Sequence, residues 1–262
     1  MMWSAWTIAK REIKSLFVSP VAYVVLGIFA LLAGIHFLLS LQAFDEALQR
    51  AQIQAQLMKN PEALSGINLN GMLISNVISF AFFILLFTLP AITMRLLSEE
   101  RNQGTYELLL TSPASAWDIV LGKFIAGAVF FLAMLVTHSL FLMVMFGYGN
   151  PEPGPVFAGY LGLFLGGLAF LAIGIFASSL TKNQIISFFV SLFISLVFLM
   201  LGWAGAKTSG NISEFLQDAS INANFETFNK GVITISAIVY FITLGAFFLT
   251  GSQVSIQSLT RR

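Results

Sequence analysis

The segment from Ser98 to Pro113 places four charged side chains in one short stretch between two long apolar runs. Glu99, Glu100, Arg101 and Glu107 all carry their charge at neutral pH and could therefore meet an oppositely charged group on another protein. A charged segment of this length indicates either a docking site for a partner or a solvated turn.

Catalytic chemistry has no candidate residues elsewhere in the chain. The sequence contains no Cys, no Gly-x-Ser-x-Gly motif and no His-Glu-x-x-His motif. It also lacks the phosphate loop of ATP-binding proteins, because Trp117 stands where the first glycine should be and Phe124 follows Gly122-Lys123. We therefore expect no catalytic residue, no metal site and no bound cofactor here, so another chain must supply any ATP hydrolysis.

The composition is typical of a membrane protein. Hydrophobic residues make up 57% of the 262 residues, charged residues make up 10%, and the mean hydropathy is +0.87. Too few polar groups remain to solvate the surface of a globular domain. The formal net charge is only +1, which lacks the basic excess that nucleic-acid binding requires, so no nucleic-acid partner is expected.

Six apolar runs are each near the roughly 20 residues that cross a hydrocarbon core about 30 Å thick. The sequence therefore predicts an all-α, polytopic membrane protein with a single transmembrane domain over 1–262. The predicted spans are Pro20 to Leu41, Gly71 to Leu97, Asp118 to Phe146, Val156 to Leu180, Gln184 to Ala206 and Gly231 to Gly251.

The basic residues are distributed unevenly over the two sides of these spans. Nine lie on the side of the two termini and four on the other side. The positive-inside rule therefore places both termini and the segment 98–117 in the cytoplasm, in a chain of the plasma membrane. The nine are Lys10, Arg11, Lys14, Arg95, Arg101, Lys123, Lys182, Arg261 and Arg262, and the four are Arg50, Lys59, Lys207 and Lys230.

An amphipathic helix is predicted over 1–19, before the first span. Apolar residues recur at helical spacing and would share one face of the helix: Trp6, Ala9, Ile13, Leu16 and Phe17. Polar residues gather on the opposite face: Thr7, Arg11, Lys14 and Ser15. Such a helix lies in the membrane interface with its basic face toward anionic lipid, or contacts a cytosolic partner. A signal peptide is the rival interpretation, but the apolar run from Val21 to Leu39 is nearly uninterrupted and no small-residue cleavage site follows it.

Within the charged segment, Gly104 is expected to end the helix that leaves the second span. Thr105 can then cap a helix of about two turns, with Glu107 in its first turn and an end before Pro113. The residues Ser115 to Asp118 resemble a capping box that opens the third span. The short helix exposes Tyr106, Leu109 and Leu110, an apolar face for the membrane or for the groove of a partner.

The polar and small residues inside the spans indicate helix packing rather than chemistry. His36 and His138 lack an acidic or second His neighbour in sequence, so we expect each to hydrogen-bond to an adjacent helix. Gly162 and Gly166, extended by Gly159, form a small-xxx-small pattern that lets helices approach closely. One stripe of the fifth span carries hydroxyls that either bond to their own helix or serve packing or a pathway: Ser187, Ser191 and Ser195.

The outer segments are short. The polar stretch after Gln42 is rich in helix formers and should continue the first helix until Asn60-Pro61. The segment 207–230 is predicted to be an outer loop whose apolar residues dock a short helix on the membrane surface.

The charged segment resembles the loop after the second span of type-2 ABC transporter permeases. The resemblance rests on Glu99, Glu100, Gly104, Thr105, Glu107, Leu108, Leu109 and Pro113, followed closely by Lys123. It extends along essentially the whole chain, including the outer segment Asn224 to Val232. Among the branches of that family, the sequence is most similar to the gliding-motility permease subunit and to the permease of copper-enzyme maturation systems.

The resemblance implies a subunit that pairs with a second permease copy and with two cytosolic ABC ATPase subunits, which bind ATP and Mg. Export would then be driven through the segment 98–117, whose short helix acts as a coupling helix. The eight matching residues from Glu99 to Pro113 would carry that role, with the charge of Glu100 facing the partner. ATP binding would drive rigid-body movement of the permease halves.

Two other classes of function remain compatible with the sequence. An ATP-independent secondary carrier or channel would need no ATPase and usually shows inverted repeats, of which no clear example is visible. A structural subunit of a surface machine would favour a large outer domain, which the short outer loops do not provide. An export path of Phe, Leu, Ser and Gly does not identify the substrate.

Overall fold

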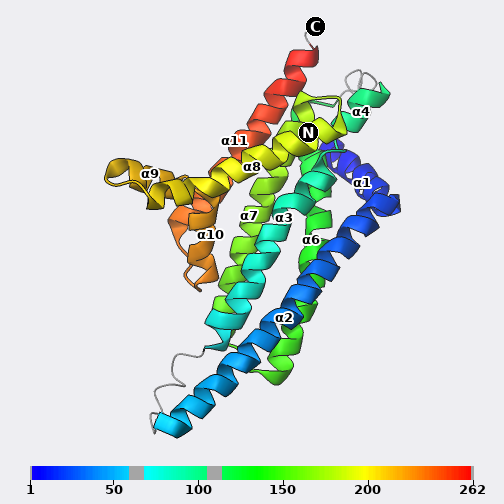
Figure 1. The fold of residues 1–262 in the computed structure, drawn as a ribbon. Helices are drawn as coiled ribbons and strands as arrows, with labels where there is room; N and C mark the ends of the chain where they lie inside the picture. Colours follow the sequence, from blue (N-terminus) through cyan, green and yellow to red (C-terminus); the bar gives the residue numbers. More distant parts are fainter. Residues whose placement is uncertain (1, 59–67, 105–113, 261–262) are drawn as a thin grey trace.

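The computed structural model describes residues 2–58, 68–104 and 114–260, all of whose regular elements are helical. Six of the described helices are long and apolar enough to cross a membrane, as the sequence predicts. Figure 1 shows them as one bundle, with both termini and α4 at the same end. The elements are α1 (Met2–Val18), α2 (Pro20–Met58), η2 (Asn70–Ile74), α3 (Ser75–Thr93), α4 (Ser98–Gln103), α6 (Ala116–Tyr148), α7 (Pro153–Leu180), α8 (Gln184–Ala206), α9 (Asn211–Asp218), α10 (Ile221–Asn229) and α11 (Ile235–Thr260).

The ends of several spanning helices differ from the predicted spans. Helix α2 continues to Met58, which confirms that the polar stretch after Gln42 prolongs the first helix. The last span was predicted to begin at Gly231, but α11 begins at Ile235. Gly231 has a φ of +84°, a left-handed conformation that no helix residue adopts, so the chain must turn there first.

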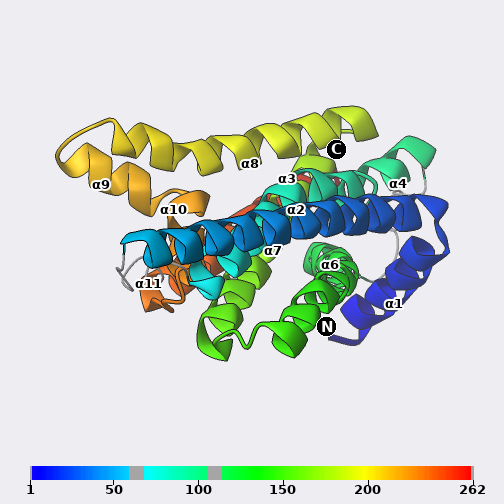
Figure 2. The ribbon, with the colours of Figure 1, turned by 60° about the horizontal axis from the view of Figure 1, so that its bottom comes forward.

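Helix α1 is a helix as expected, and it packs along α6 (Figure 2). Ala9 and Leu16 are buried, as the predicted apolar face requires, whereas Trp6 is 49% exposed. The close approach depends on Gly122 of α6, where an added Cβ would lie 2.8 Å from Cβ of Ile8. The buried face of α1 is therefore rotated away from Trp6.

Helix α7 is the centre of the bundle and α8 is at its edge. Within the most apolar stretch of each helix, 72% of the α7 residues are buried but only 17% of those in α8. Small residues explain how α7 fits between its neighbours: Gly159 lies against Ile78, Gly162 against Phe228 and Gly166 against Phe82. Backbones can approach this closely only where no Cβ intervenes.

We predict that Gly166→Ala lowers the free energy of unfolding by about 1–3 kcal/mol, the usual cost of overpacking a core. A Cβ at Gly166 would overlap the ring of Phe82, which cannot move aside because it stacks on Phe225 at 3.8 Å. Gly245→Ala in α11 is the matched control, since nothing lies within 4 Å of its Cβ. Relief of the glycine penalty should make that variant more stable, by up to about 1 kcal/mol.

Unfolding of both variants in detergent, followed by circular dichroism over a titration with dodecyl sulfate, gives the comparison. Equal stability of the two variants would contradict close packing at Gly166.

The segment 207–230, which was expected to be an outer loop with a short helix on the membrane surface, forms two short helices that differ in burial: α9 has no buried residue, whereas α10 does. It contains α9 and α10, and α10 packs into the bundle beside α3 and α7 (Figure 1). Phe225 and Phe228 are 2% and 0% exposed, so they form core contacts rather than surface contacts. Asn229 adds polar contacts by donating to Oγ of Ser75 and of Ser79, each at 2.7 Å.

The hydroxyl stripe of α8 faces the bundle. Ser187, Ser191 and Ser195 are at most 1% exposed, whereas the large apolar residues on the other side of α8 are open to the surroundings. Within the described residues, none of the three hydroxyls has a hydrogen-bond partner, so the alternative of bonding to their own helix is not observed. The small serine side chains lie on the buried side of α8, a helix that packs against α7, α3 and α10.

Both histidines bond to a neighbouring helix, as expected from the sequence. His138 Nδ1 lies 2.8 Å from the hydroxyl of Tyr160 on α7. His36 Nε2 lies 3.1 Å from Oδ1 of Asn76 on α3, and its ring stacks on Phe80. These contacts give the two histidines structural partners.

Candidate functional site

The first turns of the charged segment form α4, directly after the helix of the second span. Glu99 and Glu100 lie in the first turn of α4, where carboxylates interact favourably with the helix dipole. Gly104 ends the helix with a φ of +73°, which confirms its predicted role as a helix terminator. The remaining candidate residues lie outside the described residues, so the coupling helix itself stays a prediction: Thr105, Glu107, Leu108, Leu109 and Pro113.

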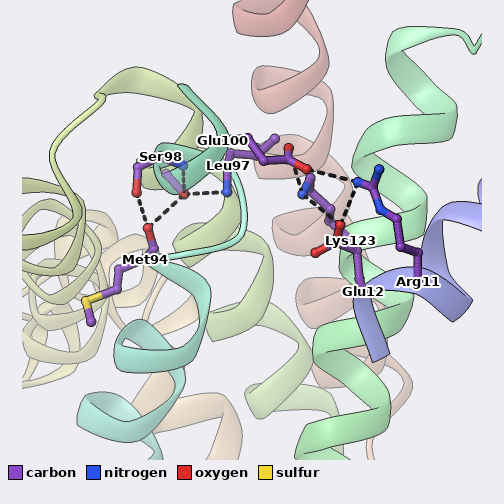
Figure 3. Close-up of polar contacts among 8 residues, drawn as sticks. Arg11, Glu12, Met94, Leu97, Ser98, Glu100 and Lys123 are labelled. Carbon is purple, nitrogen blue, oxygen red and sulfur yellow. Dashed lines mark hydrogen bonds and ion pairs between the residues drawn. The ribbon is translucent and has the colours of Figure 1, made fainter. Parts of the chain in front are cut away.

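Four charged side chains from three distant parts of the chain meet beside α4 (Figure 3). We call this group the ion-pair cluster; it consists of Arg11 and Glu12 of α1, Glu100 of α4 and Lys123 of α6. Nζ of Lys123 lies 2.9 Å from Glu100 and 3.4 Å from Glu12. Nη2 of Arg11 lies 2.9 Å from Glu12 and 3.0 Å from Glu100. Each carboxylate therefore contacts both cations, and the four charges cancel.

Burial makes the ion-pair cluster more consequential than a surface salt bridge. Lys123 is fully buried, and the side chains of Glu12 and Glu100 are only 13% and 16% exposed. A buried charge is tolerated only when an opposite charge lies beside it. The hydrogen bond from Arg11 to Glu12 raises the pKa of Arg11 above its ordinary value, so the guanidinium stays charged throughout the accessible pH range.

Helix α4 is also attached to α7 through a single serine hydroxyl. Oγ of Ser178 accepts hydrogen bonds from the backbone N–H groups of Leu97 and Ser98, both at 3.0 Å. It donates in turn to the carbonyl of Met94 at 3.2 Å. The break between α3 and α4 would otherwise leave these backbone groups unpaired, because Ser98 is completely buried.

Two arginines attach the same region to other elements. Arg95 donates to Glu99 at 2.9 Å and to Oγ of Ser19 at 2.9 Å, at the junction of α1 and α2. Arg101 donates to the carbonyl of Ser179 at the end of α7. Helix α4 is therefore held by α1, α6 and α7 at once.

The return from the charged segment into α6 has the predicted capping box. The hydroxyl of Ser115 accepts from the N–H of Asp118 at 3.2 Å, and the carboxylate of Asp118 accepts from the N–H of Ser115 at 3.0 Å. This fixes the start of α6 two helical turns before Lys123 enters the ion-pair cluster.

The structure places the carboxylate of Glu100 inside the protein, whereas the sequence led us to expect it to face a partner. Sequence reasoning also missed Glu12 and Lys123 as a pair, and Ser178 altogether. One signal was present: Lys123 follows Gly122 in an apolar helix with no acidic residue one turn away, so its counter-ion had to come from another helix.

The charged side chains of this site act as links between elements of the fold. Among the described residues, no group of three or more His, Asp or Glu side chains could hold a metal ion. The charged side chains bind one another and link α4 to the ends of several spans.

Comparison with known proteins gives a family match and a distant relative. Residues 6–250 match the family model described as ABC-2 family transporter protein. The probable multidrug ABC transporter permease YbhR of Escherichia coli strain K12 is 28% identical over 93 residues, and the same permease of strain O157:H7 is equally similar. The match covers 36% of this chain and 25% of the relative.

The name of this relative does not support the gliding-motility or copper-enzyme branch that the sequence had suggested. The family model, in contrast, covers nearly the whole chain, including all the elements that form the ion-pair cluster. This multi-pass membrane protein therefore belongs to the ABC-2 family of transporter proteins, as a transmembrane permease subunit.

Proposed function

We propose that this chain is the permease of an ATP-driven exporter and that α4 with the following segment receives the movement of a separate cytosolic ATPase subunit. ATP and Mg would be bound by that subunit, because the sequence has no phosphate loop. The ion-pair cluster carries the proposal: it joins α4 to α1 and α6 beside the very segment that resembles the coupling loop of such permeases.

The link is built to transmit a rigid-body movement. Lys123 is fully buried, so displacement of α4 would separate it from Glu100 and leave Glu12 to balance both Lys123 and Arg11. Ser178 resists the same displacement through two backbone hydrogen bonds. Helix α4 and the ends of α1, α6 and α7 should therefore move together.

The proposal includes the topology and the assembly. Both termini and α4 lie at one end of the bundle (Figure 1), and the excess of basic residues at this end supports a cytoplasmic location. A second copy of the permease, or a related permease, would complete the transport path. The multidrug name of the relative supports a drug as the class of substrate rather than a role in gliding motility.

The first test is purification of the tagged chain from its native membranes in a mild detergent, with mass spectrometry of co-purified proteins and an ATPase assay. We expect an ABC ATPase subunit to co-purify. The variant Gly104→Pro should lose it, because proline cannot adopt the φ of +73° at this position.

Gly210→Pro is the matched control, since Gly210 has a φ of +74° but lies beyond α8, far from α4. In both variants proline replaces a glycine of nearly the same positive φ, so both should be strained at that residue. A difference in binding of the ATPase subunit would therefore reflect the position of Gly104 in the charged segment. Recovery of the chain without any ATPase, or equal loss of the subunit from both variants, would contradict the proposal.

A further inference from the structure

The charged side chains on the exposed face of α1 are all cations. Lys10, Arg11 and Lys14 all lie on this face, and the side chain of Arg11 is 59% exposed. The one acid of the helix, Glu12, is turned the other way and contacts Lys123 inside the ion-pair cluster (Figure 3). In the part of the chain that the structure describes, neither Lys10 nor Lys14 forms an ion pair.

The same face carries an aromatic side chain suited to the membrane interface. Trp6 is 49% exposed, and Nζ of Lys10 lies 5.7 Å from the centre of its ring. Tryptophan is enriched at the level of lipid headgroups, because its ring is apolar and its N–H is polar. A tryptophan with lysines one and two turns further along the helix thus combines a headgroup anchor with positive charge.

The position of α1 brings this face to the membrane surface. Helix α1 ends at Val18 and α2 begins at Pro20, so the cationic face lies next to the first turns of a spanning helix. Those turns expose Val21, Tyr23 and Val24, an apolar surface that suits the edge of a membrane. A headgroup layer at this level would lie close to the exposed face of α1.

We propose that the face formed by Trp6, Lys10, Arg11 and Lys14 is a binding site for the phosphate headgroup of an anionic phospholipid. Arg11 belongs both to this face and to the ion-pair cluster, so a bound headgroup would lie beside the groups that hold α4. The site follows from α1 and α2 alone and does not depend on the transport role. An acidic surface of a soluble protein fits less well, since it would leave Trp6 and the exposed turns of α2 without their apolar surroundings.

The test uses native mass spectrometry of the purified full-length chain, with phosphatidylglycerol or phosphatidylcholine added at increasing concentrations. We expect phosphatidylglycerol to be retained preferentially. Each basic residue near a membrane surface contributes roughly a fivefold gain in affinity for anionic lipid, so the double variant K10Q/K14Q should bind phosphatidylglycerol about 25-fold more weakly.

Two further variants keep the result decisive. K207Q/K230Q removes the same charge from two exposed lysines near α9 and α10 and should bind like the unmodified chain. K10R/K14R keeps the charge and should also bind normally, which separates charge from a folding defect. Equal retention of both lipids by the unmodified chain, or normal phosphatidylglycerol binding by K10Q/K14Q, would overturn the proposal. So would equal loss of binding in K207Q/K230Q.

Discussion

Replacement of Lys123 by methionine should lower the free energy of unfolding by about 3 kcal/mol, the lower end of the cost of breaking a buried ion pair. Methionine fills a similar volume, so the loss reflects charge rather than a cavity. Without the ammonium group, Glu12 and Glu100 approach each other with only Arg11 between them, and both are largely buried. Unfolding of the purified chain in detergent, followed by circular dichroism, measures the loss.

The control is Lys207→Met, which removes an exposed lysine just after the last residue of α8. This change should alter the free energy of unfolding by less than about 0.5 kcal/mol. The triple variant K123M/E12Q/E100Q tests the cause, because it removes both carboxylates along with their cation. It should regain much of the lost stability, since the one remaining charge is that of Arg11, whose side chain is 59% exposed and needs no buried counter-ion. If K123M unfolds like the unmodified chain, the ion-pair cluster does not stabilise the junction of α1, α4 and α6.

The bundle itself was predictable because apolar length is a local property. A run of about 20 apolar residues specifies a spanning helix wherever it lies, and all six predicted spans correspond to helices. The capping box at Ser115 and the helix end at Gly104 were predictable for the same reason. Each depends on the chemistry of a few adjacent residues.

The packing of the segment 207–230 could not be predicted from adjacent residues. Its polar composition indicates an outer loop, whereas the fully buried Phe228 and the stacking of Phe225 on Phe82 draw α10 into the bundle. The partner of Phe225 is Phe82 of α3, and Phe228 packs on Gly162 of α7. Even Gly162 lies more than 60 residues before Phe228 in the sequence. Apolar residues within a polar segment are therefore ambiguous between a membrane surface and a protein groove.

The sequence predicted the segment that contains the candidate site but not the contacts within it. The resemblance selected the correct segment, but the direction of Glu100 depends on Lys123 and Arg11, and Arg11 lies 89 residues away in sequence. Ser178 gave no sequence signal, because a serine near the end of an apolar helix most often bonds to its own backbone. Its role arises only where α3 breaks beside α7 and leaves two N–H groups to be satisfied.

Reversal of one charge in the ion-pair cluster should disturb coupling more than any neutral change. In Glu100→Lys, three cations would surround Glu12 alone, and like charges in close contact cost several kcal/mol. Helix α4 should then move away from α1 and α6. We expect the E100K permease to retain its ATPase subunit. Its effect on the ATPase rate of that subunit should be about tenfold smaller than the effect of the unmodified permease, a loss within the usual range of coupling free energies.

The double variant E100K/K123E decides whether this effect comes from the pair or from α4 alone. It exchanges the two charges of one of the two shortest contacts in the cluster and keeps the total charge of the four residues unchanged. Arg11 would then meet a new cation and Glu12 a new anion, so the exchanged pair should restore only part of the stability and of the ATPase response. An E100K variant with a normal ATPase response would contradict the coupling role of the ion-pair cluster. A double variant no better than the worse single variant would show that Lys123 and Glu100 do not act as a pair.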